Sequence, residues 1–234
     1  MALPKLASAK YELTLPSTGD KVEYRPFLVK EEKALMMAQQ AGDTPSLIRA
    51  VENIVDACTF EKLNVKKLPF FDIEYIFIQL RGKSVGEKST ISIVAPDDEQ
   101  TKVTIDVNLS EVQCVKGDGH DEKIELTDNI GVIMEYPTMS SFASIDDSDE
   151  TKATFDIIKT SISQIYDAEN VYTRNDMDDK ELDEFIESMS HSQFEKLQDF
   201  FDTMPRVKHE VEIENPKTGV KSTVLLQGLQ SFFQ

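Results

Sequence analysis

The sequence predicts an α+β fold in which groups of helices flank small antiparallel β-hairpins and a sheet. Apolar residues recur at helical spacing over residues 29–87 and again over residues 151–204. Before, between and after these stretches, apolar and polar residues alternate, as they do in half-buried strands. No run approaches the roughly 18 apolar residues of a membrane span, so we expect no transmembrane segment.

The most apolar stretch, residues 68–87, is predicted to form a buried helix that serves the other elements as a core. One face of this helix carries Phe70, Ile73, Phe77 and Leu80, which follow one another at spacings of three, four and three residues. We expect Gly82 and Gly86 to end the helix. A buried strand is the alternative, because short apolar runs are ambiguous. The residues predicted to be most central are Phe71, Ile73, Ile76, Phe77 and Leu80.

The elements before this helix have clear sequence boundaries. Alternation on both sides of a Pro-Ser-Thr-Gly turn predicts a hairpin over residues 11–24. A first helix is expected over residues 29–41, ended by Gly42. A second begins at Asp43 or Thr44, with a proline in its first turn, and continues to Cys58.

After the central helix the pattern changes to short strands and then returns to helices. The expected elements are a hairpin over 91–107, strands over 112–115, 124–126 and 130–136, helices over 151–168, 182–189 and 190–204, and a last hairpin over 207–226. Ser190 and Gln193 form a capping box, and Pro205 is expected to end the helix that they begin. The apolar residues 228–233 close the chain.

These patterns divide the chain into two predicted domains. Residues 1–137 form an N-terminal α+β domain with a hairpin, three helices and a small sheet. Residues 151–234 form a C-terminal helical region with a terminal hairpin. Residues 138–150, rich in Ser and Asp, are the predicted linker.

The net charge of −18 is unevenly distributed. Residues 1–90 carry 12 acids and 13 bases, whereas residues 91–234 carry 31 acids and 12 bases. A surface this acidic is repelled by phosphate groups. We therefore expect no direct nucleic-acid binding and no membrane binding. A protein partner with a basic surface is the expected alternative.

No motif for catalysis or metal binding stands out. The three histidines have no neighbouring nucleophile or carboxylate motif and are expected at the surface or in caps. The two cysteines belong to no CxxC pair and are expected to be reduced core thiols. The acidic run over 176–187 fails as a calcium loop, because Lys180 and Glu181 occupy its fifth and sixth positions. We therefore expect no catalytic residue, no cofactor and no metal.

Four blocks of the sequence carry a resemblance to a known family. They read VEYRPFLVKEEKALMMA, CTFEKLNVKKLPFFDIEYIFIQLRGKSVGE, IELTDNIGVIMEYP, and MPRVKHEV with LQGLQSFF. The chain resembles the baseplate hub subunit family of T-even-like contractile-tailed bacteriophages over nearly its whole length. The resemblance implies a non-enzymatic role in building the baseplate hub, with other baseplate or tail proteins as partners and possible oligomers within the baseplate. It also implies location in the virion tail baseplate, and in the host cytoplasm during assembly.

Three functional classes remain open at this point. The first is a structural virion component, the second is a transient assembly chaperone absent from the finished particle, and the third is an enzyme whose site is dispersed over the fold. The amount of this chain in purified virions separates the first two classes. A cleft with convergent groups of perturbed pKa would favour the third.

Two non-periodic stretches, residues 25–29 and 82–86, are candidate partner contacts. The candidate interface residues are Arg25, Pro26, Phe27, Lys83 and Val85. Arg25 and Lys83 would supply directional contacts and Phe27 an apolar anchor, which are residue types found in interface hot spots. The alternative is that Pro26 and Phe27 only attach the first hairpin to the helix that follows, while the glycines only end the central helix.

Overall fold

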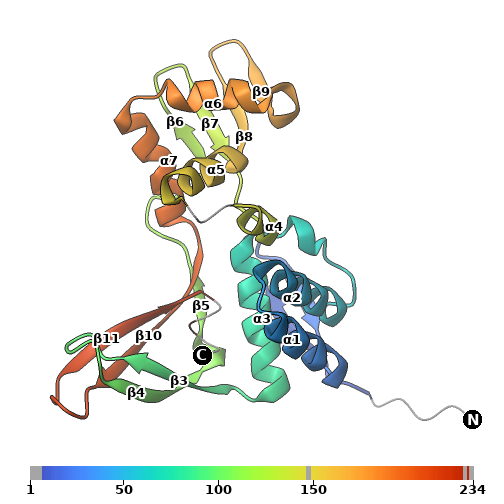
Figure 1. Ribbon diagram of the computed structural model, residues 1–234. Helices are drawn as coiled ribbons and strands as arrows, with labels where there is room; N and C mark the ends of the chain where they lie inside the picture. The colour runs from blue at the N-terminus through green and yellow to red at the C-terminus, as the bar shows by residue number, and fades with distance from the viewer. Residues whose placement is uncertain (1–6, 146–148, 229–230, 232–234) are drawn as a thin grey trace, which may run out of the picture. The chain divides into compact units, whose positions relative to one another are not determined.

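The computed structural model describes residues 7–145, 149–228 and 231, and it confirms the predicted α+β class (Figure 1). Its contacts divide into two units, each described separately below. Unit 1 comprises residues 1–115 and 205–234, and unit 2 comprises residues 116–204. In the described part of the chain, no helix is both long and apolar enough to cross a membrane.

The two units do not follow the predicted division at residues 137 and 151. Strand β5 (Gln113–Val115) pairs antiparallel with β10 (Arg206–Glu214), so the chain returns to unit 1 after its last helix. The terminal hairpin therefore belongs to the unit that contains the N-terminal helices. The predicted linker contains a short helix, α4 (Met139–Ala143), and its residues 146–148 lie outside the described part.

The helices of unit 1 are α1 (Val29–Ala41), α2 (Thr44–Cys58), the short 3₁₀ helix η1 (Val65–Lys67) and α3 (Phe70–Val85). The boundary between α1 and α2 lies where the sequence predicts it. Gly42 ends α1 in the left-handed conformation, with φ of 72°. Asp43 then caps α2, because its side chain accepts a hydrogen bond of 2.8 Å from the Ser46 N–H.

Helix α3 is the buried helix that the sequence predicts, which excludes the strand alternative. Each of the five residues predicted to be central is at most 2% exposed. The helix continues through Gly82 and ends at Gly86, so the expectation that Gly82 helps to end it is wrong. A Cβ at Gly82 would lie 3.6 Å from the Leu109 Cβ, so the glycine sits at a packing contact with the 3₁₀ helix η2 (Leu109–Glu111).

The strands of unit 1 form three small antiparallel sheets. Strand β1 (Tyr11–Thr14) pairs with β2 (Lys21–Tyr24), and β3 (Lys88–Val94) pairs with β4 (Lys102–Asn108). The third sheet has the order β11-β10-β5, with β11 at Lys221–Gln227. One core cluster joins the last two of these sheets to α3 and consists of Ile78, Ile91, Val107, Leu109, Val112, Val207 and Leu226.

Two hairpin turns of unit 1 are each held by a carboxylate from another element. Asp72, in the first turn of α3, accepts hydrogen bonds from the N–H and the hydroxyl of Ser17 in the β1–β2 turn. Asp97, in the β3–β4 turn, accepts from the Asn215 amide at 3.0 and 3.1 Å and from the Thr218 hydroxyl. Turns that project from their own sheets are thereby fixed to neighbouring elements.

Unit 2 contains a four-stranded antiparallel sheet covered by helices. The strand order is β6 (Lys123–Glu125), β7 (Gly131–Met134), β8 (Ile162–Tyr166) and β9 (Val171–Thr173). The helices are α5 (Glu150–Ser161), α6 (Asp179–Glu187) and α7 (His191–Thr203). The capping box of Ser190 and Gln193 begins α7 as predicted. The shared core includes Val132, Met134, Ile158, Leu182, Ile186, Leu197 and Phe200.

The predicted helix over 151–168 is wrong in its second half. Helix α5 ends at Ser161, and the chain continues directly as strand β8. Ile158, Ile162 and Ile165 have helical spacing, but all three reach the same core with the last two in a strand. Strand β8 pairs with β7 on one side and β9 on the other, and these long-range bonds override the local pattern.

The predicted apolar end over residues 228–233 lies outside the described residues except for Gly228 and Ser231.

The burial of α3 gives a direct stability prediction. Phe77→Ala should lower the free energy of unfolding by about 3–5 kcal/mol, because it removes a fully buried aromatic ring. Urea denaturation of the whole chain measures the loss. Met37→Ala, at an exposed position on α1, is the control and should cost less than about 0.5 kcal/mol. A loss for Phe77→Ala below about 1 kcal/mol would contradict the central role of α3.

Candidate protein-interaction surface

The structure brings together the two stretches that the sequence identifies as candidate contacts. The Phe27 N–H donates a hydrogen bond of 2.9 Å to the Ser84 hydroxyl, which in turn donates to the Leu80 carbonyl. The segment between β2 and α1 therefore lies against the end of α3. Phe27 and Ser84 are 57 positions apart in the chain, and periodicity alone gives no sign of their contact.

Arg25 is bonded within the fold rather than displayed at the surface. Its guanidinium donates to the Glu31 carboxylate at 2.9 Å and to the Pro26 carbonyl at 3.0 Å. The side chains of Arg25 and Glu31 are only 13% and 7% exposed. Glu31 also accepts a bond of 2.7 Å from the Leu28 N–H, so the pair holds the first turn of α1 in place.

The environment of Glu31 favours its charged form. Burial alone would raise the pKa of Glu31, but hydrogen bonds from Arg25, the Leu28 N–H and Lys30 outweigh burial and lower that pKa below 4.5. The folded state therefore gains stability from Glu31 at pH values above its ordinary pKa. This gain is lost as the pH falls through the lowered value.

The other four candidate residues divide between interior and surface. Phe27 is buried and Pro26 is half-buried, so both also attach the segment to the fold. Lys83 forms an ion pair with Glu87 and lies 5.4 Å from the centre of the Tyr11 ring. Val85 is 58% exposed. A partner role for the five residues stays a prediction, and the surface positions of Lys83 and Val85 fit it best.

The exposed apolar residues of α1 are a feature that the sequence analysis missed. Within α1, Glu31 is the one fully buried residue, while Leu35 and Ala38 are half-buried. Val29, Met36 and Met37 are 78%, 56% and 61% exposed. Their spacing of seven and eight residues places them on a side of the helix that faces away from Leu35 and Ala38. In the sequence, the signal for this exposed group is that Val29, Met36 and Met37 recur at helical spacing on the side opposite Leu35 and Ala38.

We define the junction surface as the exposed apolar residues at the start and on the outward side of α1, together with Lys83 and Val85 at the end of α3. Its apolar members are Leu28, Val29, Met36, Met37 and Val85, and Lys83 is half-buried. Exposed apolar residues near a cation are typical of protein-interaction sites. Methionine side chains adapt to the shape of a partner because they are unbranched and flexible.

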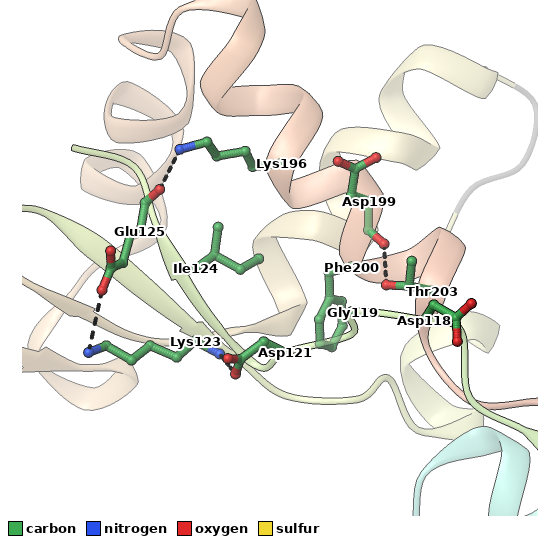
Figure 2. Close-up of a pocket in the computed structure, with 10 residues that line it drawn as sticks. All are labelled: Asp118, Gly119, Asp121, Lys123, Ile124, Glu125, Lys196, Asp199, Phe200 and Thr203. Atoms are coloured by element: carbon green, nitrogen blue, oxygen red, sulfur yellow. Dashed lines mark hydrogen bonds and ion pairs between the residues drawn. The ribbon is translucent and has the colours of Figure 1, made fainter. Parts of the chain in front are cut away.

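Unit 2 contains a separate hollow of about 520 Å³ between β6 and α7 (Figure 2). Lys196 reaches across from α7 and donates a bond of 2.6 Å to the Glu125 carbonyl on β6. Asp118, Asp121 and Asp199 also line it. The rest of the lining includes Lys123, Phe200 and Thr203.

His120, beside this hollow, is buried, so the expectation of a surface or cap position is wrong for it. The Thr203 hydroxyl donates to the Asp199 carbonyl at 2.6 Å and therefore accepts from His120 Nδ1 at 2.9 Å. His120 Nε2 then accepts from the Tyr136 hydroxyl at 2.9 Å. Burial lowers the pKa of His120 below 6.5, which favours this neutral form. These bonds give the ring a structural role.

The two cysteines and His191 are other groups with reactive side chains that the sequence analysis considered. Burial raises the pKa of the Cys58 and Cys114 thiols to about 11 and about 12, so neither is a ready thiolate. His191 is exposed and faces Glu195 on the same helix. Over residues 7–145, 149–228 and 231, no group of three or more histidine, cysteine or acidic residues could hold a metal ion.

Comparison with known proteins identifies one family. The family model described as T4 bacteriophage base plate protein matches residues 8–234. No curated protein and no solved structure matches the chain.

The buried pair at the start of α1 generates a stability prediction. Arg25→Ala should lower the free energy of unfolding by about 3–5 kcal/mol at neutral pH, because it leaves the Glu31 carboxylate buried with fewer partners. The loss should shrink as the pH falls through the lowered pKa of Glu31, because the carboxyl group is then protonated in both the folded and the unfolded state. Urea denaturation at neutral pH and at a series of acidic pH values measures both effects.

Two further variants sharpen this test. Lys83→Ala should cost less than about 1 kcal/mol, because its ion pair is partly exposed to solvent. Adding Glu31→Gln to Arg25→Ala should recover part of the loss by removing the unpaired charge. An Arg25→Ala loss that is small and independent of pH would show that the pair does not hold α1.

Proposed function

This chain belongs to the T4 bacteriophage base plate protein family, and we propose that it is a non-enzymatic structural component of the hub of the tail baseplate. The match over residues 8–234 carries this proposal, because it includes both units of the fold. The partners are other baseplate or tail proteins. The transient assembly chaperone is the alternative that shares the same partners.

The junction surface supports the proposal. A helix whose outward side presents Val29, Met36 and Met37 to water is costly to maintain unless another protein covers it. Val85 adds an exposed apolar side chain at the end of α3, and Lys83, two residues before it, adds a positive charge. An apolar centre with a polar rim is the usual composition of a protein interface.

Stoichiometry in purified virions tests the structural role. Quantitative mass spectrometry should find this chain in mature particles, in a fixed ratio to the other baseplate proteins. The same ratio should hold in baseplate intermediates isolated from infected cells. Presence in the intermediates and absence from mature particles would assign the chain to the chaperone alternative.

Substitutions on the junction surface test its use. Met36→Glu combined with Val85→Asp should prevent incorporation into baseplates while leaving the melting temperature within a few degrees of the original, because both positions are exposed. The matched control is Val171→Asp, a 60% exposed valine in unit 2, which should incorporate normally. Normal incorporation of the double variant would show that the partner contacts a different surface.

The acidic residues give a second, independent test. Unit 2 carries 23 acids and 7 bases, which is a net charge of −16, whereas the rest of the chain carries 20 acids and 18 bases. If a basic partner surface approaches unit 2, the association rate should fall steeply as ionic strength rises from low to physiological values. Stopped-flow mixing with the isolated partner measures this rate. An association rate that does not change with ionic strength would mean that the negative charge of unit 2 contributes to solubility alone.

A further inference from the structure

Strand β11 forms an open edge of unit 1. It is the terminal strand of the sheet β11-β10-β5, and it pairs with β10 over all seven of its residues (Figure 1). Among the described residues, no strand pairs with its other side. An edge of this length presents a row of backbone groups that another strand could bond.

The register identifies which backbone groups point outward. The ladder is bounded by bonds from the Asn215 N–H to the Val220 carbonyl and from the Gly228 N–H to the Val207 carbonyl. Bonded and non-bonded pairs alternate in an antiparallel ladder, so Ser222, Val224 and Leu226 bond to β10. The alternate residues Lys221, Thr223, Leu225 and Gln227 turn their N–H and C=O groups to the open edge. At the end of the strand, the Gln227 carbonyl already accepts a bond of 2.6 Å from the Ser231 hydroxyl.

This edge lacks the usual protection against pairing. The β10–β11 register is regular, with no bulge, and β11 contains no proline. Its one charged residue, Lys221, lies at the end of the strand. Near its centre Leu225 is 47% exposed. Bulges, prolines and charged side chains commonly protect edge strands, and the central residues of β11 have none of them.

Two other edges of the fold are less suited to accept a strand. At β6, the outward Lys123 N–H already bonds to Asp121 at 2.9 Å, and the Glu125 carbonyl accepts from Lys196. At β3, the exposed side chains along the strand are polar until Val94, and Thr90 bonds across to Asp106 at 2.8 Å. Strand β11 combines an open backbone at Lys221, Thr223 and Leu225 with an exposed apolar centre.

We propose that β11 pairs antiparallel with β11 of a second copy of this chain, which makes a two-fold symmetric dimer. With the axis at Val224, Lys221 of one copy lies opposite Gln227 of the other, and Thr223 lies opposite Leu225. The strand is self-complementary, because this register places no like charges opposite each other. Each Leu225 gains a neighbour across the new pair. The contact lies in unit 1, which carries little of the net charge, so self-repulsion there is small.

Proline substitution at an outward position tests the pairing on the whole chain. Thr223→Pro removes an N–H that points to the open edge, so it should leave the β10–β11 ladder intact and block the second strand. Sedimentation velocity at about 100 µM protein should show dimers for the original chain and monomers for this variant. Thr223→Val keeps the N–H and should dimerise like the original. Ser92→Pro makes the equivalent change on the open edge of β3 and should also leave the dimer unchanged.

A second variant keeps the test valid if the proline disturbs folding. Leu225→Lys changes an exposed side chain, and in the dimer it would place lysines diagonally across the two-fold axis. Its dimer dissociation constant should rise by about tenfold or more, and the rise should diminish at high salt.

Two results would overturn the proposal. One is a monomeric original chain at this concentration, and the other is dimerisation that Thr223→Pro and Leu225→Lys both leave unchanged. A monomeric chain whose Thr223→Pro variant fails to enter baseplates would show that a different protein uses the edge. Because incorporation is scored separately, failure of the self-pairing leaves the proposed baseplate function open to its own tests.

Discussion

The burial of α3 is the constraint on which unit 1 depends. The helix is apolar almost all round, so a single covering layer would leave part of its surface in water. It is instead contacted by α2, by η2 and by strands β5 and β10, which come from distant parts of the chain. Asp72 in its first turn also binds the β1–β2 turn through Ser17. The return of the chain to unit 1 after α7 follows from this requirement, since β10 supplies part of the cover.

Because α3 is covered without it, α1 is left as a peripheral helix. It packs against α2, and polar links hold its start, namely the buried pair of Arg25 and Glu31 and the bond from Phe27 to Ser84. The side of α1 that carries Val29, Met36 and Met37 is left exposed. This arrangement explains why Arg25 and Phe27, which the sequence analysis selected as interface candidates, are bonded or buried within the fold. It also explains why Met36 and Met37, which that analysis did not select, remain exposed to a partner.

The two proposed contacts use different physical means. The junction surface offers flexible apolar side chains, which adapt to a partner of different shape. The β11 edge offers backbone bonds in a fixed register, which suit an identical strand related by two-fold symmetry. The acidic surface of unit 2 acts over a longer range than either, and its effect falls with salt. A baseplate component that contacts several neighbours could use all three without conflict, because different residues carry them.

The sequence alone determined the elements whose signals are local. The ends of α1 and α2 follow from Gly42 and Asp43, and the buried character of α3 follows from the density of its apolar residues. The family resemblance also came from the sequence, and the match over residues 8–234 supports it at the level of the baseplate. Only the tertiary structure decided the features that depend on distant partners. These are the strand at Ile162, the buried position of His120, the placement of the terminal hairpin in unit 1, and the interior role of Arg25. Each depends on a hydrogen bond or contact between residues far apart in the chain, except Arg25, whose burial depends on how β2, α1 and α2 pack around it. A periodic pattern records which side of an element is apolar, but not what lies against it.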